Sequence, residues 1–357
     1  MTIEVSWFGA LCDDDYEFLG VPDPELQSSW PHCRDIVQTA DRLGFDNILL
    51  PSGYKLGIDT VAFASAIATR VEQIQLLVAV RMGEMWVPQL ARQLATIDQM
   101  LDGRLTINII SSDIPGESLE SGPRYQRTIE WMQVLRSLLN NENIDFHGEF
   151  LDLELEAPRI STVSGKCPPF YFGGFSENAK DVAAREADVF LTWPDKVSAV
   201  AETAREMRDR AAEHDRSLAI GLRSHVIVRE TEAEARAAAD RLVSRLDPET
   251  GDAIRGRSLD SASVGVQRQA ELRESASGDG YAEPNLWTGI GRARSGAGAA
   301  IVGDPDQVVG KIQEYQEAGV DAFIFSGYTH IEEAERFAEM VLPRLDHGRL
   351  RDSLPVG

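Results

Sequence analysis

The sequence has few cysteines, few basic residues and no long apolar run. Cys12, Cys33 and Cys167 form no CxxC pair, and so sparse and odd a set is not a disulfide framework. No apolar run approaches the roughly 18 residues that cross a bilayer. The opening MTIEVSWFG lacks the basic and apolar regions of a signal peptide. These absences predict a cytoplasmic protein in a reducing compartment.

The charge balance is strongly acidic. The 357 residues include 58 Asp and Glu against 35 Lys and Arg, which gives a net charge of −23 at pH 7. Such a surplus repels nucleic acid and anionic membranes, so neither is expected as a partner. The six histidines are scattered and none forms an HxxxH pair, so no metal site is expected.

What the chain does contain is an alternation of buried segments and helical patterns. Short β-branched or aromatic runs predict eight strands, at 2–11, 46–52, 74–81, 104–111, 169–174, 188–193, 218–228 and 321–327. The helices before two of them end at Gly44 and Gly319, where a left-handed C-cap is favourable. Eight such units favour a closed (β/α)₈ TIM barrel. The alternative is an open doubly wound sheet with a nucleotide site, but GIGRARSG (289–296) is not the GxGxxG fingerprint and does not follow the first strand.

Two intervals are too long to be simple connections within a single barrel domain spanning 1–357. The interval 112–168 contains a helical pattern at 127–139 and then NIDFHGEFLDLEL, which predicts a hairpin with His-Gly at its turn. The interval 245–300 is rich in Ser, Gly and charged residues. Insertions of this kind often cover active sites, so we expect 245–300 to form a mobile lid.

The stretch LRSHVIVR (222–229) places two nitrogen-rich side chains in an apolar strand. Because side chains alternate with period two, Arg223 and His225 share one face. A buried histidine is often satisfied by a backbone carbonyl, which is the plain interpretation of His225. Burying both side chains together is costly unless an anion, a carboxylate or water meets them. The pair therefore predicts a ligand cavity.

Other polar residues follow the strands, at the end where TIM barrels carry their sites. Arg81, Arg223, Arg292 and Arg294 near one mouth would suit a phosphate, sulfonate or carboxylate, although each could instead pair with a surplus carboxylate. YFGGFSEN (171–178) runs from a strand through Gly-Gly into a helix, which fits either a phosphate site or a tight structural turn. Tyr328 could donate a proton or pack at the rim, and Trp7 and Trp193 could flank a planar ring or fill the barrel.

Motifs over nearly the whole chain carry a resemblance. These are WF (7–8), ADRLGFDNILLPSG, LLVAVR, RYQR, PPFYFGGFSENA, DVFLTW, LRSHVIVRET, NLWTGIGRARSGAGAAIVGD and FIFSGYTHIEEA. In order and spacing they resemble the bacterial luciferase-like flavin monooxygenases, and within them the two-component alkanesulfonate monooxygenases. The resemblance implies a TIM barrel that uses O₂ and reduced FMN, delivered by a separate NAD(P)H:FMN reductase as a transient partner. It also implies cleavage of an organosulfonate to sulfite and an aldehyde, and a homodimer or homotetramer.

The resemblance assigns roles to matched positions. Its catalytic residues correspond to Arg223, His225, Arg294 and Tyr328. Its flavin contacts correspond to Ser52, Asn108, Ile110, Tyr125, Phe175 and Ser176, with the last two at the phosphate. Trp193 and Arg292 join the substrate site. Guanidinium groups suit a sulfonate because they bind its oxygens in pairs.

Two substrate-site positions depart from the family pattern. Cys12 stands where the family has histidine, and Leu56 stands where it has cysteine. The departures are compatible with a hydroxylated substrate, so we expect a sulfosugar such as sulfoquinovose rather than a simple alkanesulfonate. A sulfone monooxygenase, an F420-dependent dehydrogenase on the same barrel and a non-catalytic flavin-binding protein are the alternatives.

Overall fold

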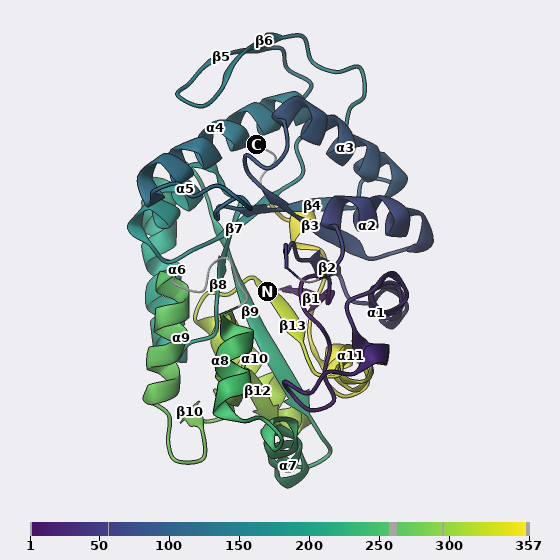
Figure 1. The fold of residues 1–357 in the computed structure, drawn as a ribbon, viewed down its shortest axis with the longest axis vertical. Helices are drawn as coiled ribbons and strands as arrows, with labels where there is room; N and C mark the ends of the chain where they lie inside the picture. Colours follow the sequence, from purple (N-terminus) through teal and green to yellow (C-terminus); the bar gives the residue numbers. More distant parts are fainter. Residues whose placement is uncertain (1, 56, 257–262, 295, 355–357) are drawn as a thin grey trace.

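The computed structural model describes residues 2–55, 57–256, 263–294 and 296–354, and its centre is a closed barrel of eight parallel strands (Figure 1). Around the ring the order is β9, β13, β1, β2, β3, β4, β7 and β8, and pairing of β8 with β9 closes it. The predicted (β/α)₈ barrel is therefore confirmed. Its strands are β1 (Glu4–Phe8), β2 (Asn47–Leu50), β3 (Gln75–Arg81), β4 (Leu105–Ile110), β7 (Phe170–Gly173), β8 (Val189–Thr192), β9 (Ala219–Val228) and β13 (Ala322–Ser326).

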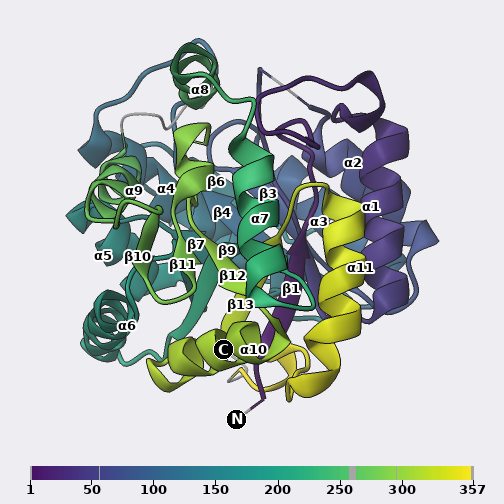
Figure 2. The same ribbon diagram turned by 90° about the horizontal axis from the view of Figure 1, so that it is seen from below.

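Helices between the strands surround the barrel, as Figure 2 shows from below. Helix α1 begins after Ser29, whose side chain accepts from the His32 N–H, and ends at Gly44 with φ 85°, as predicted. Gly319 has φ 101° just beyond the C-cap of α10. The helices are α1 (Trp30–Leu43), α2 (Thr60–Ile67), α3 (Val87–Met100), α4 (Ser121–Leu139), α5 (Glu177–Glu186), α6 (Val197–Ala212), α7 (Glu232–Val243), α8 (Pro248–Arg255), α9 (Val264–Glu274), α10 (Pro305–Glu317) and α11 (His330–Met340).

Strand β9 has ten residues against four in its neighbour β8, and besides β13 it pairs with two strands along one edge. Its first half closes the barrel against β8, and its second half pairs with β12 (Ala300–Gly303). Antiparallel β11 (Leu286–Trp287) and β10 (Tyr281–Glu283) extend this side sheet. The sequence analysis missed these three strands because they are short and β12 follows a Gly- and Ala-rich stretch without alternation.

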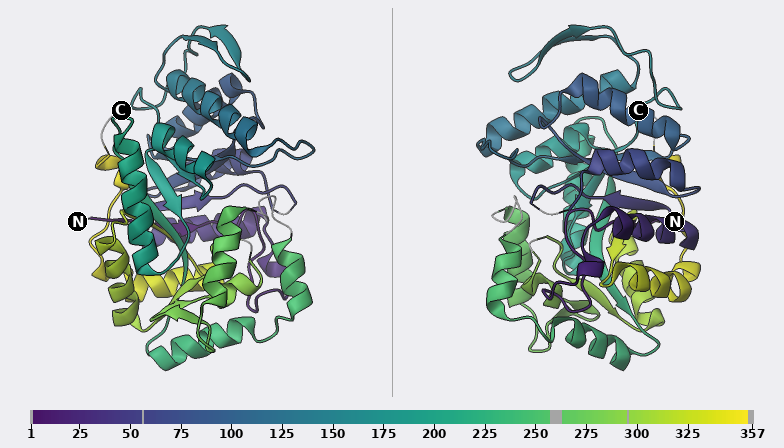
Figure 3. Two further views of the ribbon diagram at one scale, coloured as in Figure 1. Left: turned by 90° about the vertical axis from the view of Figure 1, so that its left-hand side faces the viewer. Right: turned by 45° about the vertical axis from the view of Figure 1, so that its right-hand side comes forward.

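The interval 112–168 contains α4 and a two-stranded hairpin that projects from one end of the molecule (Figure 3). The hairpin joins β5 (Ile144–His147) to β6 (Asp152–Leu155), which confirms that prediction. Buried Glu130 of α4 accepts from the backbone N–H groups of Glu149, Phe150 and Leu151 at 2.8–2.9 Å. This carboxylate fixes the hairpin turn, because it satisfies three donors that the turn leaves unpaired.

The core has an apolar layer between strands and helices and a polar floor inside the barrel. Trp7 belongs to the first, since it is fully buried and its ring lies 5.2 Å from that of Phe45. In the second, the buried carboxylate of Glu4 accepts from Tyr171 Oη at 3.0 Å and Gln75 Nε2 at 3.2 Å. The floor closes one end of the barrel. No helix formed by the described residues is both long and apolar enough to span a membrane.

Candidate functional site

A cavity of about 430 Å³ opens at the carboxyl ends of the barrel strands. Its wall includes the ends of β4, β7 and β8 and, from the interval 245–300, Ser263–Gly265 at the start of α9. Every position that the resemblance assigns to flavin lines this cavity, together with Trp193 and two buried arginines. These residues are Ser52, Asn108, Ile110, Tyr125, Phe175, Ser176, Trp193, Arg81 and Arg223.

Arg223 is a buried cation with no acidic partner among the described residues. Only 6% of it is exposed. Its guanidinium donates to Ser326 Oγ at 2.7 Å and to the Ser224 carbonyl at 2.6 Å, and lies 4.3 Å from the centre of the Phe8 ring. Burial lowers its pKa to about 9, and the charge of Arg294 acts in the same direction. An anion in the cavity would relieve both effects.

His225 lies next to Arg223 and is neutral. Burial, reinforced by the charge of Arg223, holds its pKa well below 6.5. Ser326 Oγ accepts from Arg223 and lies 2.8 Å from His225 Nδ1, so the serine proton is available to Nδ1. A neutral imidazole then carries its own proton on Nε2, which has no hydrogen-bond partner of normal geometry among the described residues. The backbone of Ala297 makes a weaker contact with this ring that acts to raise its pKa, in keeping with the plain interpretation of a histidine near a backbone carbonyl.

Arg294 contacts the same phenylalanine ring as Arg223. Its guanidinium carbon is 5.4 Å from the centre of the Phe8 ring. It donates to Asp13 Oδ2 at 3.1 Å and to Tyr328 Oη at 2.9 Å. Because the Tyr328 oxygen accepts here, its own proton remains free to be donated elsewhere. Burial raises the pKa of Tyr328 to about 12, so the hydroxyl is neutral at pH 7.

The far end of the cavity has the features of a phosphate cradle. Ser176 caps α5 by accepting from the Ala179 N–H at 3.2 Å, and it donates to Tyr125 Oη at 3.3 Å. A Cβ at Gly174 would lie 2.6 Å from Ala179 Cβ, so only glycine fits. Arg124 lines the same end. A helix N-terminus, hydroxyl groups and a cation are the groups that bind a phosphate, so these residues fit the phosphate of FMN.

The remaining candidates lie at different depths. Burial raises the pKa of Cys12 to about 11, so its thiol is neutral beside Arg294 and Arg223. Arg292 is exposed, donates weakly to the Leu246 carbonyl at 3.4 Å and does not line the cavity. Arg81 pairs with Glu84 at 3.0 Å, as the plain interpretation of the arginines anticipates. Leu56 lies outside the described residues.

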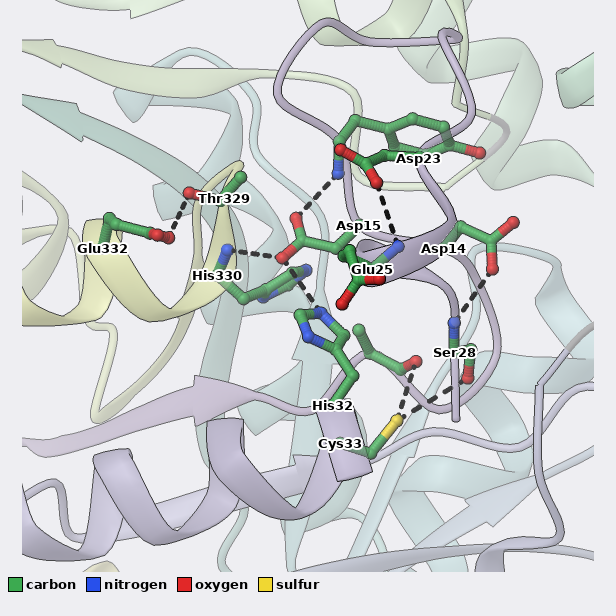
Figure 4. Close-up of polar contacts among 12 residues, drawn as sticks. Asp14, Asp15, Asp23, Glu25, Ser28, His32, Cys33, Thr329, His330 and Glu332 are labelled. Carbon is green, nitrogen blue, oxygen red and sulfur yellow. Dashed lines mark hydrogen bonds and ion pairs between the residues drawn. The ribbon is translucent and has the colours of Figure 1, made fainter. Parts of the chain in front are cut away.

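Sequence reasoning did not foresee that the acidic loop after β1 contains a buried carboxylate. Asp15 is fully buried, and its carboxylate accepts from the His330 N–H at 2.9 Å and the Tyr16 N–H at 2.8 Å (Figure 4). The same carboxylate lies 3.2 Å from His32 Nε2 at the start of α1. Asp15 thus ties the loop to α1 and to the start of α11, two residues after Tyr328. CDDDY gives no signal for this, because three adjacent acids look like solvated surface.

No cluster of three or more His, Cys, Asp or Glu side chains suited to a metal ion occurs among the described residues. Among the described residues, Arg223 and the phosphate cradle line the cavity. His225, Tyr328 and Arg294 form a cluster next to Arg223 without lining the cavity themselves. This arrangement can bind an anion beside a phosphorylated cofactor.

Two curated relatives are similar to this chain over most of their length. A sulfoquinovose monooxygenase of Novosphingobium aromaticivorans is 61% identical over 354 residues, which covers 97% of this chain and 98% of the relative. One from Agrobacterium fabrum is 51% identical, covering 96% and 89%.

Solved structures share the fold at low identity. EDTA monooxygenase (EmoA) from Chelativorans sp. BNC1 has a TM-score of 0.79 at 18% identity, covering 100% of this chain and 96% of that one. DmoA from Hyphomicrobium sulfonivorans has a TM-score of 0.78 at 17% identity, covering 99% and 92%. Luciferase-like monooxygenase is the family that matches residues 19–322. The chain therefore belongs to the luciferase-like monooxygenase family.

Proposed function

We propose that this enzyme is a reduced-FMN- and O₂-dependent monooxygenase that cleaves the carbon–sulfur bond of sulfoquinovose. The observation that carries the proposal is buried Arg223, which lines the cavity without an acidic partner among the described residues. The relatives named sulfoquinovose monooxygenase, at 61% and 51% identity, support the choice of substrate.

The sulfonate would bind to the two guanidinium groups that contact Phe8. Arg223 and Arg294 can both donate to its oxygens, and burial strengthens these charge-assisted bonds. His225 holds a proton on Nε2 and Tyr328 holds one on Oη. Both can hydrogen-bond an oxygen on which negative charge develops, and Cys12 beside them contributes an uncharged wall.

FMN would occupy the cavity, with its phosphate at Ser176, Tyr125 and the start of α5. Ser52, Asn108, Ile110 and Phe175 would contact the rest of the molecule, and Trp193 would lie at the substrate side. When bound in its reduced form, FMN supplies the two electrons that convert one atom of O₂ to water while the other atom oxidises the sulfonate-bearing carbon. The products are an aldehyde, sulfite, oxidised FMN and water.

The proposal extends to the organisation of the protein. A separate NAD(P)H:FMN reductase would deliver the flavin, and the chain would work as one barrel domain in a homodimer or homotetramer in the cytoplasm. The interval 245–300 would act as a lid, because it supplies both Arg294 and the Ser263–Gly265 wall of the cavity. Excluding water in this way protects reactive intermediates of oxygen chemistry.

The test is sulfite release by the purified protein with an FMN reductase, NADH, FMN and air. Sulfoquinovose, linear alkanesulfonates and dimethyl sulfone are offered separately. We expect sulfite from sulfoquinovose, with kcat/KM at least about tenfold above that for any linear alkanesulfonate, and no reaction with the sulfone. Absence of sulfite from every sulfonate, with reduced FMN shown to bind, would refute the proposal.

A further inference from the structure

Asp13 places a carboxylate beside the cationic groups of the proposed anion site. Asp13 Oδ2 accepts from Arg294 at 3.1 Å, and Asp13 Oδ1 accepts from the Asp14 N–H at 3.0 Å. The Asp13 side chain is only 19% exposed and the Arg294 side chain 14%. A negative charge is thus held at the place where, on the proposed function, another negative charge must bind.

Four other titratable groups around this site are neutral at pH 7. Burial raises the pKa of Cys12 to about 11 and that of Tyr328 to about 12. Burial lowers the pKa of His330 to about 4 and holds that of His225 well below 6.5. Asp15 directs its carboxylate at His32 and at backbone N–H groups. Among the described residues, the charged groups of this cluster are the guanidinium groups of Arg223 and Arg294 and the carboxylate of Asp13, a net of one positive charge. Arg81 at the cavity wall is neutralised by Glu84.

One net positive charge matches a sulfonate, which carries a single negative charge at every pH from acid to neutral. A phosphate monoester carries between −1.5 and −2 at pH 7, because its second pKa is about 6. Its extra charge would lie close to Asp13 in a buried setting, where like charges repel strongly. Sugar phosphates have the same hydroxylated ring and a tetrahedral anion at the same end, so shape alone separates them poorly from a sulfosugar.

We propose that Asp13 is a specificity-determining residue that matches the site to a monoanionic sulfosugar and rejects the dianionic phosphate ester of the same sugar. The inference rests on the proposed function and adds the basis of its selectivity. Two arginines without Asp13 would hold a dianion at least as well as a monoanion. Asp13 removes that preference and also keeps Arg294 in place before the substrate arrives, since it and Tyr328 hold the guanidinium.

The experiment uses two ligands that differ in charge alone, glucose 6-sulfate and glucose 6-phosphate, with sulfoquinovose as the reference. Their dissociation constants are measured by calorimetry on the FMN-saturated protein at pH 7.5. The wild type is compared with Asp13→Asn, which keeps an oxygen acceptor for Arg294 and for the Asp14 N–H. Asp14→Asn is the matched control, because its carboxylate accepts from the Ser28 N–H at 2.9 Å and from no arginine.

We expect the wild type to bind the sulfate ester at least about tenfold more tightly than the phosphate ester. Asp13→Asn should reduce that ratio at least about tenfold, mainly through tighter phosphate binding, while Asp14→Asn keeps the wild-type ratio. An unchanged ratio in Asp13→Asn would overturn the inference and leave the proposed function standing. A wild type that binds no sulfoquinovose would overturn the proposed function and the inference with it.

A second measurement needs no variant. Lowering the pH from 7.5 to 5.5 converts much of the phosphate ester to its monoanion and leaves the sulfate ester unchanged. The wild type should then bind glucose 6-phosphate several-fold more tightly, with little change for glucose 6-sulfate. Equal pH dependence of the two ligands would contradict the role of Asp13.

Discussion

Arg223 lies within β9 and Arg229 directly follows the strand. The two arginines differ in whether an acidic side chain pairs with them. Arg223 has no ion pair among the described residues, whereas Arg229 forms two hydrogen bonds to Glu333, which is 2% exposed. A buried charge without a partner costs stability and is retained where it serves binding, while a paired charge supports the fold. The two residues therefore make a matched test of function against stability.

We expect Arg223→Met to lower kcat/KM for sulfoquinovose at least about 100-fold without lowering the melting temperature. Arg229→Met should keep the affinity for the substrate but lose about 2 kcal/mol of stability, because Glu333 is left with Arg336 alone. Steady-state kinetics and thermal melts of both variants decide the matter. Loss of stability without loss of activity in Arg223→Met would contradict the role given to Arg223.

The neutral histidines of the site predict how stability depends on pH. His330 has a pKa near 4 in the folded protein, whereas an unfolded histidine titrates near 6.5. As the pH falls below 6.5 the unfolded chain gains a proton that the folded protein does not, so this contribution to stability is complete above pH 6.5 and is lost toward pH 4. The expected slope is about 1.4 kcal/mol per pH unit for each such histidine.

The measurement is urea unfolding of the wild type and His330→Gln between pH 7 and pH 5. The carboxylates and the other histidines act in both proteins, so the difference in slope isolates His330. We expect a shallower dependence in the variant. A steeper or identical slope would show that His330 is already protonated in the folded protein.

For individual side chains, the sequence predicts some contacts and not others. Period-two alternation places Arg223 and His225 on one face, and both contact Ser326. Nothing in CDDDY distinguishes Asp13, which binds Arg294, from Asp14 and Asp15, which serve backbone groups and His32. Phe8 reads as an ordinary core residue, because its contacts with two guanidinium groups depend on segments more than 200 residues away.

Among the helices and strands, α5 allows the most direct test, because its N-terminus lies at the proposed phosphate end of the cavity. Gly174→Ala would place a Cβ 2.6 Å from Ala179 Cβ and push the first turn of α5 out of position. We expect FMN affinity to fall at least about tenfold. Gly122→Ala in α4 is the control, since a Cβ there meets nothing within 4 Å.

Fluorescence quenching of FMN on titration with each variant gives the two affinities. Equal loss in both variants, or none in Gly174→Ala, would mean that the phosphate binds elsewhere.

The boundaries of these helices are largely predictable from the sequence, since Gly44 ends α1 and the Gly-Gly-Phe-Ser stretch leads into α5. Strand β12 could not be predicted, because it forms by pairing with residues 225–228 of β9, beyond the part of β9 that pairs with β8.

For the whole molecule, the eight barrel strands followed from the hydrophobic pattern, and the motifs over the chain gave the family. The pattern could not show that the two barrel ends differ. One end is closed by Glu4 and its hydrogen-bonded partners, and the other opens into the cavity that contains Arg223. A protein with a net charge of −23 thus places a guanidinium group without an acidic partner among the described residues inside this cavity.

The central claim is that this site couples reduced FMN and O₂ to cleavage of a sulfonate. The most direct test is a single turnover without any reductase. The protein is mixed anaerobically with chemically reduced FMN and sulfoquinovose, then exposed to O₂, and sulfite and hydrogen peroxide are measured against the flavin oxidised. The account predicts nearly one sulfite per reduced FMN and little peroxide. Complete reoxidation of the flavin with peroxide but no sulfite would contradict it.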